Sequence, residues 1–196
     1  MRGDAVMGHD EGMEQPQDVR HLWILRHAKA APEATWGGKD RDRTLTERGR
    51  RDASALGQRL ATEDPPLGLV GLARPEVAIC SSAVRTVETA ELVLGVGEEQ
   101  IPLDIFQSLY QADPDTVLTY LREIDEHARS AIVIGHNPTM YNLVWDLLAE
   151  RSTDRDTLAA AGFPTCGVAV LALRVGAWED VAEGCATLEG LFAPPY

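Results

Sequence analysis

The chain has 196 residues, of which 18 are lysine or arginine, 31 are aspartate or glutamate, and 44% are hydrophobic. A chain of this length and composition can bury a sizeable core without disulfides or a structural metal, and we expect one globular domain over residues 21–196. The formal net charge of −13 disfavours nucleic acid as a partner, because binding to its phosphate backbone depends on clustered basic side chains.

Residues 1–20 form a polar N-terminal segment that lacks the apolar stretch of a secretory signal, and we expect a disordered tail there. No apolar run in the chain approaches the ~20 residues that a membrane-spanning helix needs. The three cysteines, Cys80, Cys166 and Cys185, are odd in number and widely spaced. This pattern favours a reducing compartment over a disulfide framework. We therefore expect a cytoplasmic protein without membrane or nucleic-acid partners; the sequence leaves its oligomeric state open.

From His21 onward, short apolar runs alternate with segments of helical period. This alternation predicts an α/β fold of three layers, with a mostly parallel central sheet flanked by helices. The predicted buried strands are Leu22–Leu25, Val77–Cys80, Ile132–Ile134 and Val168–Leu173, with two further candidates at Ile101–Ile105 and Ala186–Leu188.

Four amphipathic helices are predicted between these strands, each opening at a polar residue that can act as its N-cap. The four predicted caps are Thr46, Ser82, Asp113 and Asn137. The polar segment Ala30–Arg43 reads as a long loop, and a loop of this length in a compact domain is expected to cover or rim a site. Glu63–Gly71 and Glu150–Thr157 are predicted to be exposed connections.

Polar side chains follow three of the predicted strands at the points where the strands end. Arg26 and His27 follow the first strand, Arg85 opens the helix after the second, and His136 follows the third. Because the carboxyl ends of parallel strands line one crevice, we expect these four side chains to converge.

Two guanidinium groups, two imidazoles and two helix N-termini at one place would make a strong anion site, and a phosphoryl group fits it best. The sequence has no Walker-type loop, so protein cations would neutralise the phosphate, and a central histidine can attack phosphorus as a nucleophile. Each residue also has a structural interpretation: Arg85 could form an ion pair with Glu88 or Glu47, and His136 could close a turn.

Three segments of the chain resemble the histidine phosphatase (phosphoglycerate mutase-like) superfamily. Leu25-Arg26-His27-Ala28-Lys29 resembles its Arg-His-Gly or Arg-His-Ala signature, and the segment 81–90 is similar to its Ser-Pro-x-x-Arg-Ala-x-x-Thr-Ala motif. Gly135-His136-Asn137-Pro138 is similar to its second-histidine motif. The short chain and the segment 42–49 resemble the SixA-type phosphohistidine phosphatases within the superfamily.

The resemblance implies a phosphoglycerate mutase-like fold and assigns roles to the matching residues. His27 would be the nucleophile that is transiently phosphorylated, Arg26 and Arg85 would clamp phosphoryl oxygens, and His136 would stabilise the developing charge. Arg43 would bind substrate at the rim of the site, although an ion pair with Asp40 or Asp42 that orders the loop is an equal alternative. Neither a metal nor a cofactor is implied.

The family members that act on alkoxide leaving groups commonly present a glutamate between the second arginine and the second histidine. The comparable stretch here, residues 106–113, contains no glutamate, although Asp113 or Asp42 could replace it. An imidazole leaves from phosphohistidine with little help from an acid, so this absence favours phosphohistidine on a protein as the substrate. The alternatives are a small phosphate ester of metabolism as substrate, or a phosphoprotein-binding module without catalysis.

Overall fold

The computed structural model describes residues 19–96 and 101–196, and a single six-stranded sheet forms its centre. Residues 1–18 of the predicted tail lie outside the described residues, whereas Val19 and Arg20 belong to the first strand, and Arg20 is buried. The strands are β1 (Val19–Arg26), β2 (Val77–Ser81), β3 (Leu103–Phe106), β4 (Ser130–Gly135), β5 (Val168–Arg174) and β6 (Ala186–Phe192).

The sheet is mixed but mostly parallel, which confirms the predicted α/β class. Its order is β3-β2-β4-β1-β5-β6. The first four strands in this order run parallel to one another, and β5 runs antiparallel to both of its neighbours. The carboxyl ends of β1, β2 and β4 therefore lie at one edge of the sheet, where ligands bind in open sheets of this kind.

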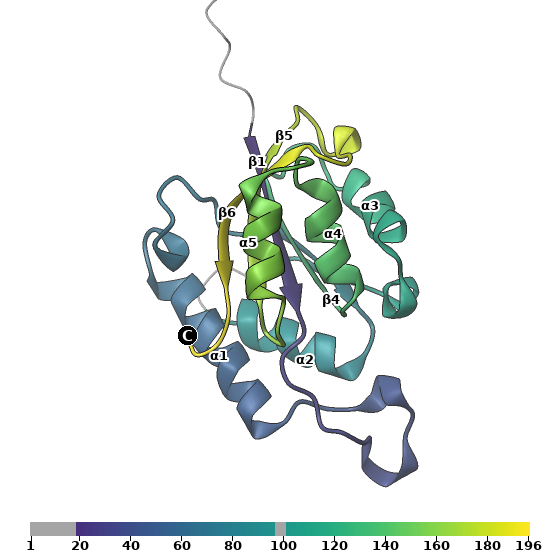
Figure 1. Cartoon of the computed structure of the whole chain (residues 1–196). Coiled ribbons are helices and arrows are strands. Elements are labelled where there is room, and N and C mark those ends of the chain that lie inside the picture. The colour runs from purple at the N-terminus through teal and green to yellow at the C-terminus, as the bar shows by residue number, and fades with distance from the viewer. Residues whose placement is uncertain (1–18, 97–100) are drawn as a thin grey trace, which may run out of the picture.

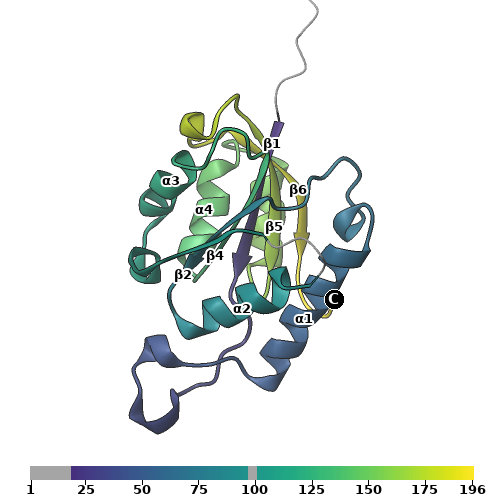
Figure 2. The ribbon, with the colours of Figure 1, turned by 180° about the vertical axis from the view of Figure 1, so that it is seen from behind.

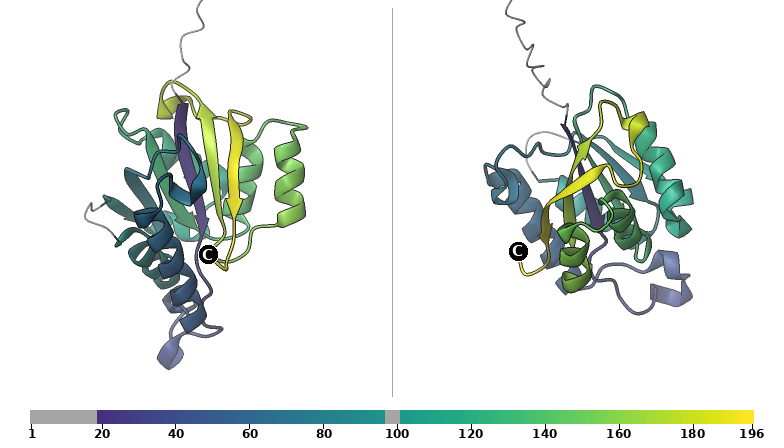
Figure 3. Two further views of the ribbon diagram at one scale, coloured as in Figure 1. Left: turned by 90° about the vertical axis from the view of Figure 1, so that its left-hand side faces the viewer. Right: turned by 45° about the horizontal axis from the view of Figure 1, so that its top comes forward.

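Helices cover both faces of the sheet (Figures 1 and 2). The helices α1 (Glu47–Thr62) and α2 (Val84–Leu94) lie on one face, whereas α3 (Pro114–Arg122), α4 (Thr139–Leu147) and α5 (Thr153–Ala161) lie on the other. The two layers are seen on opposite sides of the strands in the left panel of Figure 3. No helix in the described part of the chain is long and apolar enough to cross a membrane.

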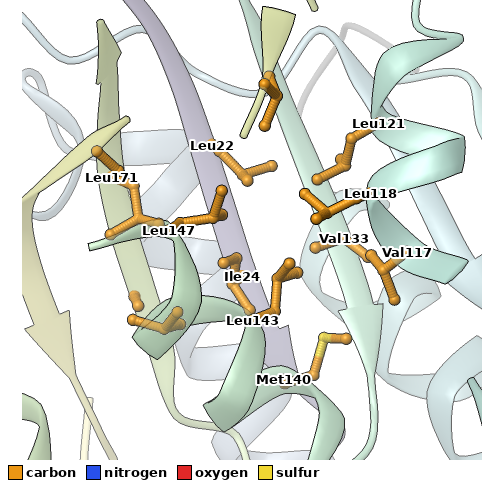
Figure 4. Packing of buried hydrophobic residues seen from close by; sticks show 14 of the residues in the cluster. Leu22, Ile24, Val117, Leu118, Leu121, Val133, Met140, Leu143, Leu147 and Leu171 are labelled. Carbon is orange, nitrogen blue, oxygen red and sulfur yellow. The ribbon is translucent and has the colours of Figure 1, made fainter. Parts of the chain in front are cut away.

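The core consists of two hydrophobic clusters, one on each face of the sheet, and β1 contributes to both. Leu22 and Ile24 pack with residues of α3 and α4 (Figure 4), whereas Trp23 and Leu25 pack with α1 and α2. Successive side chains of a strand point to opposite faces, so a strand that is covered on both sides reads as a continuous apolar run. Each fully buried Leu or Ile contributes roughly 1.5–3 kcal/mol relative to an exposed one.

Two of the four predicted helix caps are confirmed. The Thr46 hydroxyl accepts from the Gly49 N–H, and the Asp113 carboxylate accepts from the Thr116 N–H. The predictions for Ser82 and Asn137 were wrong: α2 has Ala83 and α4 has Pro138 as N-cap, and neither makes a side-chain cap bond. The Asn137 amide instead donates to the Phe163 carbonyl at 2.9 Å.

The connection predicted at Glu150–Thr157 was also wrong, because α5 begins inside it at Thr153 with Ser152 as its cap. This helix buries only Leu158, so its sequence lacks the apolar stripe at helical spacing that would have indicated a helix.

The long loop between β1 and α1 extends past the carboxyl edge of the sheet (Figure 1), and hydrogen bonds hold its two ends together. The Lys29 carbonyl accepts from both the backbone N–H and the hydroxyl of Thr46, and the Ala31 N–H donates to the Thr44 carbonyl. Gly49 lies so close to the Lys29 carbonyl that a Cβ there would meet the oxygen at 2.2 Å, which explains a glycine inside the helix.

Candidate active site

His27 follows β1 directly, and its backbone is held on both sides. Its N–H donates to the Gly135 carbonyl, and its own carbonyl accepts from the Cys166 N–H, both at 3.0 Å. The ring is buried, and Nδ1 lies 2.8 Å from the Ala28 carbonyl. Because a carbonyl can only accept, Nδ1 carries the proton in this bond, and the lone pair of the neutral ring lies on Nε2. This is the tautomer that a nucleophilic Nε2 requires.

His136 follows β4, and its ring centroid lies 5.2 Å from that of His27. Its Nε2 lies 2.8 Å from the Ser81 hydroxyl at the end of β2, so the two neighbouring strands meet at this ring. When the hydroxyl donates to Nε2, Nδ1 is left as the N–H donor. Nδ1 is buried and has no hydrogen-bond partner among the described residues.

The two predicted clamp arginines lie on the same edge of the sheet and are oriented by backbone carbonyls. Arg26 donates from Nη1 to the Phe163 carbonyl at 2.9 Å, and the Asn137 amide donates to the same carbonyl. Arg85, in the first turn of α2, is 6% exposed and donates from Nη1 to the Asp40 carbonyl at 2.8 Å. Arg26 is half-buried and Arg85 is buried, and two guanidinium groups at one edge of the sheet are a composition suited to an oxyanion.

A single hydroxyl connects the histidine segment to the helix that carries Arg85. The Thr89 hydroxyl accepts from the Ala28 N–H at 3.0 Å and donates to the Arg85 carbonyl at 2.6 Å. The first of these bonds links the backbone next to His27 to α2, and the second, within the helix, orients the hydroxyl that accepts it.

Four nitrogen atoms of the site are buried without a hydrogen-bond partner in the described part of the chain: Nε of Arg26, Arg43 and Arg85, and Nδ1 of His136. Nε of Arg20 and of Arg155, away from the site, also lacks such a partner, so it is the gathering of such donors at one place that carries the argument. A buried donor without a partner costs about 1–3 kcal/mol, more when it is charged. A tetrahedral oxyanion offers acceptors to several such donors at once, so these atoms indicate that the site takes a ligand of this kind.

At the rim, Asp40 of the long loop is bound by three side chains. Its Oδ2 accepts from Arg85 Nη2 at 3.1 Å and from the Tyr110 hydroxyl at 2.7 Å, and its Oδ1 lies 3.3 Å from Arg43 Nε. The Tyr110 ring also lies 5.7 Å below the Arg85 guanidinium and 5.6 Å from the His136 ring. Arg43 thus forms the predicted ion pair with Asp40 at the rim, and its role in substrate binding stays a prediction.

The electrostatics of the site keep both histidines neutral near pH 7. Burial, reinforced by the positive charges of Arg85, Arg26 and Arg43, lowers the pKa of His27 to about 4. Burial also lowers the pKa of His136 to about 3, and the neighbouring His27 and Arg85 act in the same direction. A neutral imidazole is the form that can attack phosphorus.

We expect acid to destabilise the protein through His27. Between pH 6.5 and 4 the unfolded imidazole is protonated and the folded one is not, so the unfolded chain binds more protons and stability falls as the pH is lowered. With a pKa of about 4 in the folded chain, the loss amounts to about 3 kcal/mol at 1.36 kcal/mol per pH unit. Urea unfolding between pH 7 and 4 should show this loss in the wild type and a correspondingly smaller one in His27→Asn.

The matched control for this measurement is His127→Asn. His127 is fully exposed, and its hydrogen bond to Asp125 raises its pKa, so its contribution has the opposite sign. Equal acid sensitivity of the wild type and His27→Asn would contradict the low pKa of His27.

The two aspartates considered as replacements for the missing acid have other partners. Asp113 accepts from the Thr116 N–H and hydroxyl, and these bonds lower its pKa. Asp42 accepts from the Lys39 N–H at 2.9 Å within the loop. Both carboxylates are therefore engaged in capping their own turns, as expected for Asp113.

The structure brings all four predicted strand-end residues to one edge of the sheet and places Arg43 beside them. Among residues 19–96 and 101–196, no group of three or more His, Cys, Asp or Glu side chains is arranged to hold a metal ion. Sequence reasoning missed the contacts of Ser81 with His136, of Thr89 with Ala28, and of Tyr110 with Asp40. Ser81 and Thr89 lie within residues 81–90, the segment that is similar to the second family motif. Membership of this segment is the one sequence feature that could have indicated their contacts.

Comparisons with known proteins show the family to which the chain is similar. The family described as the histidine phosphatase superfamily (branch 1) matches residues 22–113. An uncharacterized protein of Mycobacterium tuberculosis is 34% identical over 173 residues, which cover 87% of this chain and 99% of that protein. An uncharacterized protein of Mycobacterium leprae is 30% identical over the same shares of the two chains.

Among solved structures, a proposed phosphohistidine phosphatase SixA of Nakamurella multipartitia superposes with a TM-score of 0.76. The two sequences are 30% identical, and the match covers 91% of this chain and 98% of that one. A proposed phosphohistidine phosphatase SixA of Agrobacterium tumefaciens is also 30% identical, with a TM-score of 0.68 over 89% of this chain and 98% of that one.

Proposed function

Since the chain belongs to the histidine phosphatase superfamily, we propose that it is a metal-independent phosphatase that removes the phosphoryl group from phosphohistidine on a protein. His27 is the nucleophile in this proposal, Arg26 and Arg85 bind the phosphoryl oxygens, and His136 donates to them. Arg43 contributes positive charge at the rim.

The observation that carries the proposal is the hydrogen bond from His27 Nδ1 to the Ala28 carbonyl. It leaves Nε2 as the basic nitrogen of a neutral, buried ring, and unpartnered donors of Arg26, Arg85 and His136 belong to the same site. A binding module would need the donors but not a nucleophile in the reactive tautomer, so this bond favours catalysis over binding alone.

In the first step, Nε2 of His27 attacks phosphorus, and the bond from phosphorus to the substrate nitrogen breaks with its electron pair passing to the leaving ring. The arginines and His136 neutralise the charge on the three phosphoryl oxygens, which is the main contribution a protein makes to phosphoryl transfer. In the second step, water attacks phosphorus, the bond to Nε2 breaks, and orthophosphate leaves with His27 restored. The proton on Nδ1 stays in place throughout.

The preference for a nitrogen leaving group is supported by the partners of Asp113 and Asp42. An alkoxide leaves only when an acid protonates it, and such an acid contributes roughly 10²–10⁴ in rate. The hydrogen bonds from Thr116 lower the pKa of Asp113, and Asp42 accepts from the Lys39 N–H within its own turn. An imidazole, in contrast, leaves as a neutral molecule near pH 7.

The test compares three substrates in the presence of a chelator: a phosphohistidine protein, an aryl phosphate and an alkyl phosphate. We expect kcat/KM for phosphohistidine to exceed that for the alkyl ester by at least about 10²-fold, which is the rate factor that a general acid would supply to an alkoxide leaving group. His27→Asn is the blank, and Asp113→Asn, which preserves a helix cap, should behave as the wild type.

Fast hydrolysis of the alkyl ester would contradict the proposal. It would mean that the site contains a general acid and that a small phosphorylated metabolite is the substrate. Loss of that activity in Asp113→Asn would then identify the acid.

A further inference from the structure

Asp40 is the residue of the site that phosphoryl binding leaves unexplained, because it brings a negative charge to an anion site. Its side chain is 56% exposed, yet its carboxylate contacts Arg85, Tyr110 and Arg43. Oδ2 already accepts two hydrogen bonds, whereas Oδ1 has only the Arg43 contact at 3.3 Å among the described residues. A carboxylate oxygen has two lone-pair positions, so Oδ1 has room for a further donor.

The position of Asp40 relative to His27 gives this carboxylate a place in the reaction. His27 is 8% exposed and Arg85 6% exposed, so the nucleophile and the clamp form the inner part of the site. Asp40, whose side chain is 56% exposed, is bound to Arg85 and to Tyr110, and the Tyr110 ring lies 5.6 Å from the His136 ring. In a phosphoryl transfer the leaving group lies in line with the nucleophile, on the far side of phosphorus. With the nucleophile buried, the exposed Asp40 and the half-buried Tyr110 are available to contact a leaving group.

We propose that Asp40 and Tyr110 form the subsite for the leaving group, in which the Asp40 carboxylate accepts a hydrogen bond from the N–H of a departing imidazole. This inference rests on the proposed function and specifies its substrate as a phosphohistidine whose ring is protonated at the nitrogen that does not carry phosphorus. The Tyr110 hydroxyl donates to the carboxylate and holds it in position, and the Tyr110 ring forms one side of the subsite.

The chemistry of the step balances without an acid from the protein. The ring enters with a proton on its second nitrogen, the bond from phosphorus to the first nitrogen breaks, and the electron pair makes the ring a neutral imidazole that keeps its N–H. A carboxylate that accepts from this N–H favours the protonated, reactive ring. The hydrogen bond from Tyr110 and the charges of Arg85 and Arg43 lower the pKa of Asp40, so it acts as an acceptor and not as a proton donor.

The experiment measures kcat/KM of Asp40→Asn against pH on phosphohistidine and on an aryl phosphate, which carries the same phosphoryl group but no N–H. We expect a 10- to 100-fold loss on phosphohistidine, the usual value of a hydrogen bond to a charged group, and less than a threefold change on the aryl phosphate. The alkaline limb of the phosphohistidine profile should move to lower pH, because the ring loses its proton more readily.

The matched control is Asp42→Asn. Asp42 belongs to the same 3-10 turn, Asp40–Asp42, and its substitution changes the net charge equally, but its carboxylate contacts Lys39 and Arg41 and not Arg85 or Tyr110. Both substrates should be hydrolysed at wild-type rates. Tyr110→Phe, which removes only the hydroxyl bound to Asp40, should reproduce part of the Asp40→Asn loss on phosphohistidine.

Two results would overturn the inference. Equal losses on both substrates would mean that Asp40 only positions Arg85, and equal gains would mean that its carboxylate only competes with the phosphoryl group for that arginine. If the wild type hydrolyses the aryl phosphate but not phosphohistidine, the proposed function itself fails. If the wild type hydrolyses both and Asp40→Asn keeps the wild-type ratio between them, only the leaving-group subsite fails.

Discussion

Replacement of His27 by asparagine is expected to reduce the turnover of phosphohistidine by a factor on the order of 10⁵–10⁶, the cost of removing a nucleophile from a covalent mechanism. Asparagine retains an amide that can donate to the Ala28 carbonyl, but it has no nitrogen that can attack phosphorus. The measurement is a single-turnover reaction with radiolabelled phosphohistidine protein. The wild type should form an acid-labile, alkali-stable phosphoenzyme, and the variant should form none.

The same variant should still bind the phosphorylated protein, since the donors of Arg26, Arg85 and His136 remain. His127→Asn removes an exposed histidine that pairs with Asp125 and should leave both turnover and phosphoenzyme unchanged. A phosphoenzyme that still forms in His27→Asn would assign the nucleophile to another residue, and a variant that no longer binds would point to misfolding.

Replacement of Arg85 by alanine is expected to lower kcat by about 10²–10³, because the guanidinium stabilises charge that develops on the phosphoryl oxygens in the transition state. Arg85→Lys should recover only part of this loss, since lysine keeps the charge but not the fork of two donors. Arg85 is buried and its two hydrogen bonds to Asp40 are lost in the variant, so the free energy of unfolding should fall by about 0.5–3 kcal/mol, as for an ordinary substitution at a buried position.

Steady-state kinetics on phosphohistidine and urea unfolding separate these two effects. Arg48→Ala serves as the control, because Arg48 carries the same charge on the exposed face of α1, where it pairs with Asp52. Normal turnover in Arg85→Ala would remove this residue from the site, and a large loss of stability would assign it a structural role instead.

The sequence predicted the fold because the strands that build it are covered on both faces. A strand such as β1 reads as an apolar run whichever way its neighbours point, and β2, β4 and β5 read in the same way. The direction of β5 has no such signal, because a buried antiparallel strand has the same composition as a parallel one. The helix α5 was not predicted because it buries a single side chain, so its sequence has no apolar stripe at helical spacing.

The four strand-end residues could be predicted as one cluster because topology alone brings the carboxyl ends of parallel strands together. The rim could not be predicted in this way. Asp40 and Tyr110 lie 70 residues apart in the sequence, and they meet only because the long loop folds back over the first turn of α2. Tyr110 lies four residues past the end of β3, as Arg85 does past the end of β2, but no charge marked it as a site residue. Asp40 lies in a loop, and a loop carries no periodicity from which its path could be derived.

The Thr89 hydroxyl helps to order the backbone on both sides of the site during folding, before any ligand binds. It accepts from the Ala28 N–H, 61 residues away in the sequence, and donates to the Arg85 carbonyl. The spacing between the backbone next to His27 and α2 is therefore set as the chain folds and not when a phosphoryl group binds. The entropy of ordering those groups is lost on folding, and the binding energy of the phosphoryl group remains available for its transition state. The loop that carries Asp40 is anchored differently, because at Asp40 its contacts with other segments come from the side chains of Arg85 and Tyr110. A substitution at either residue should therefore loosen the rim while the bonds of Thr89 still set the spacing of the reacting groups.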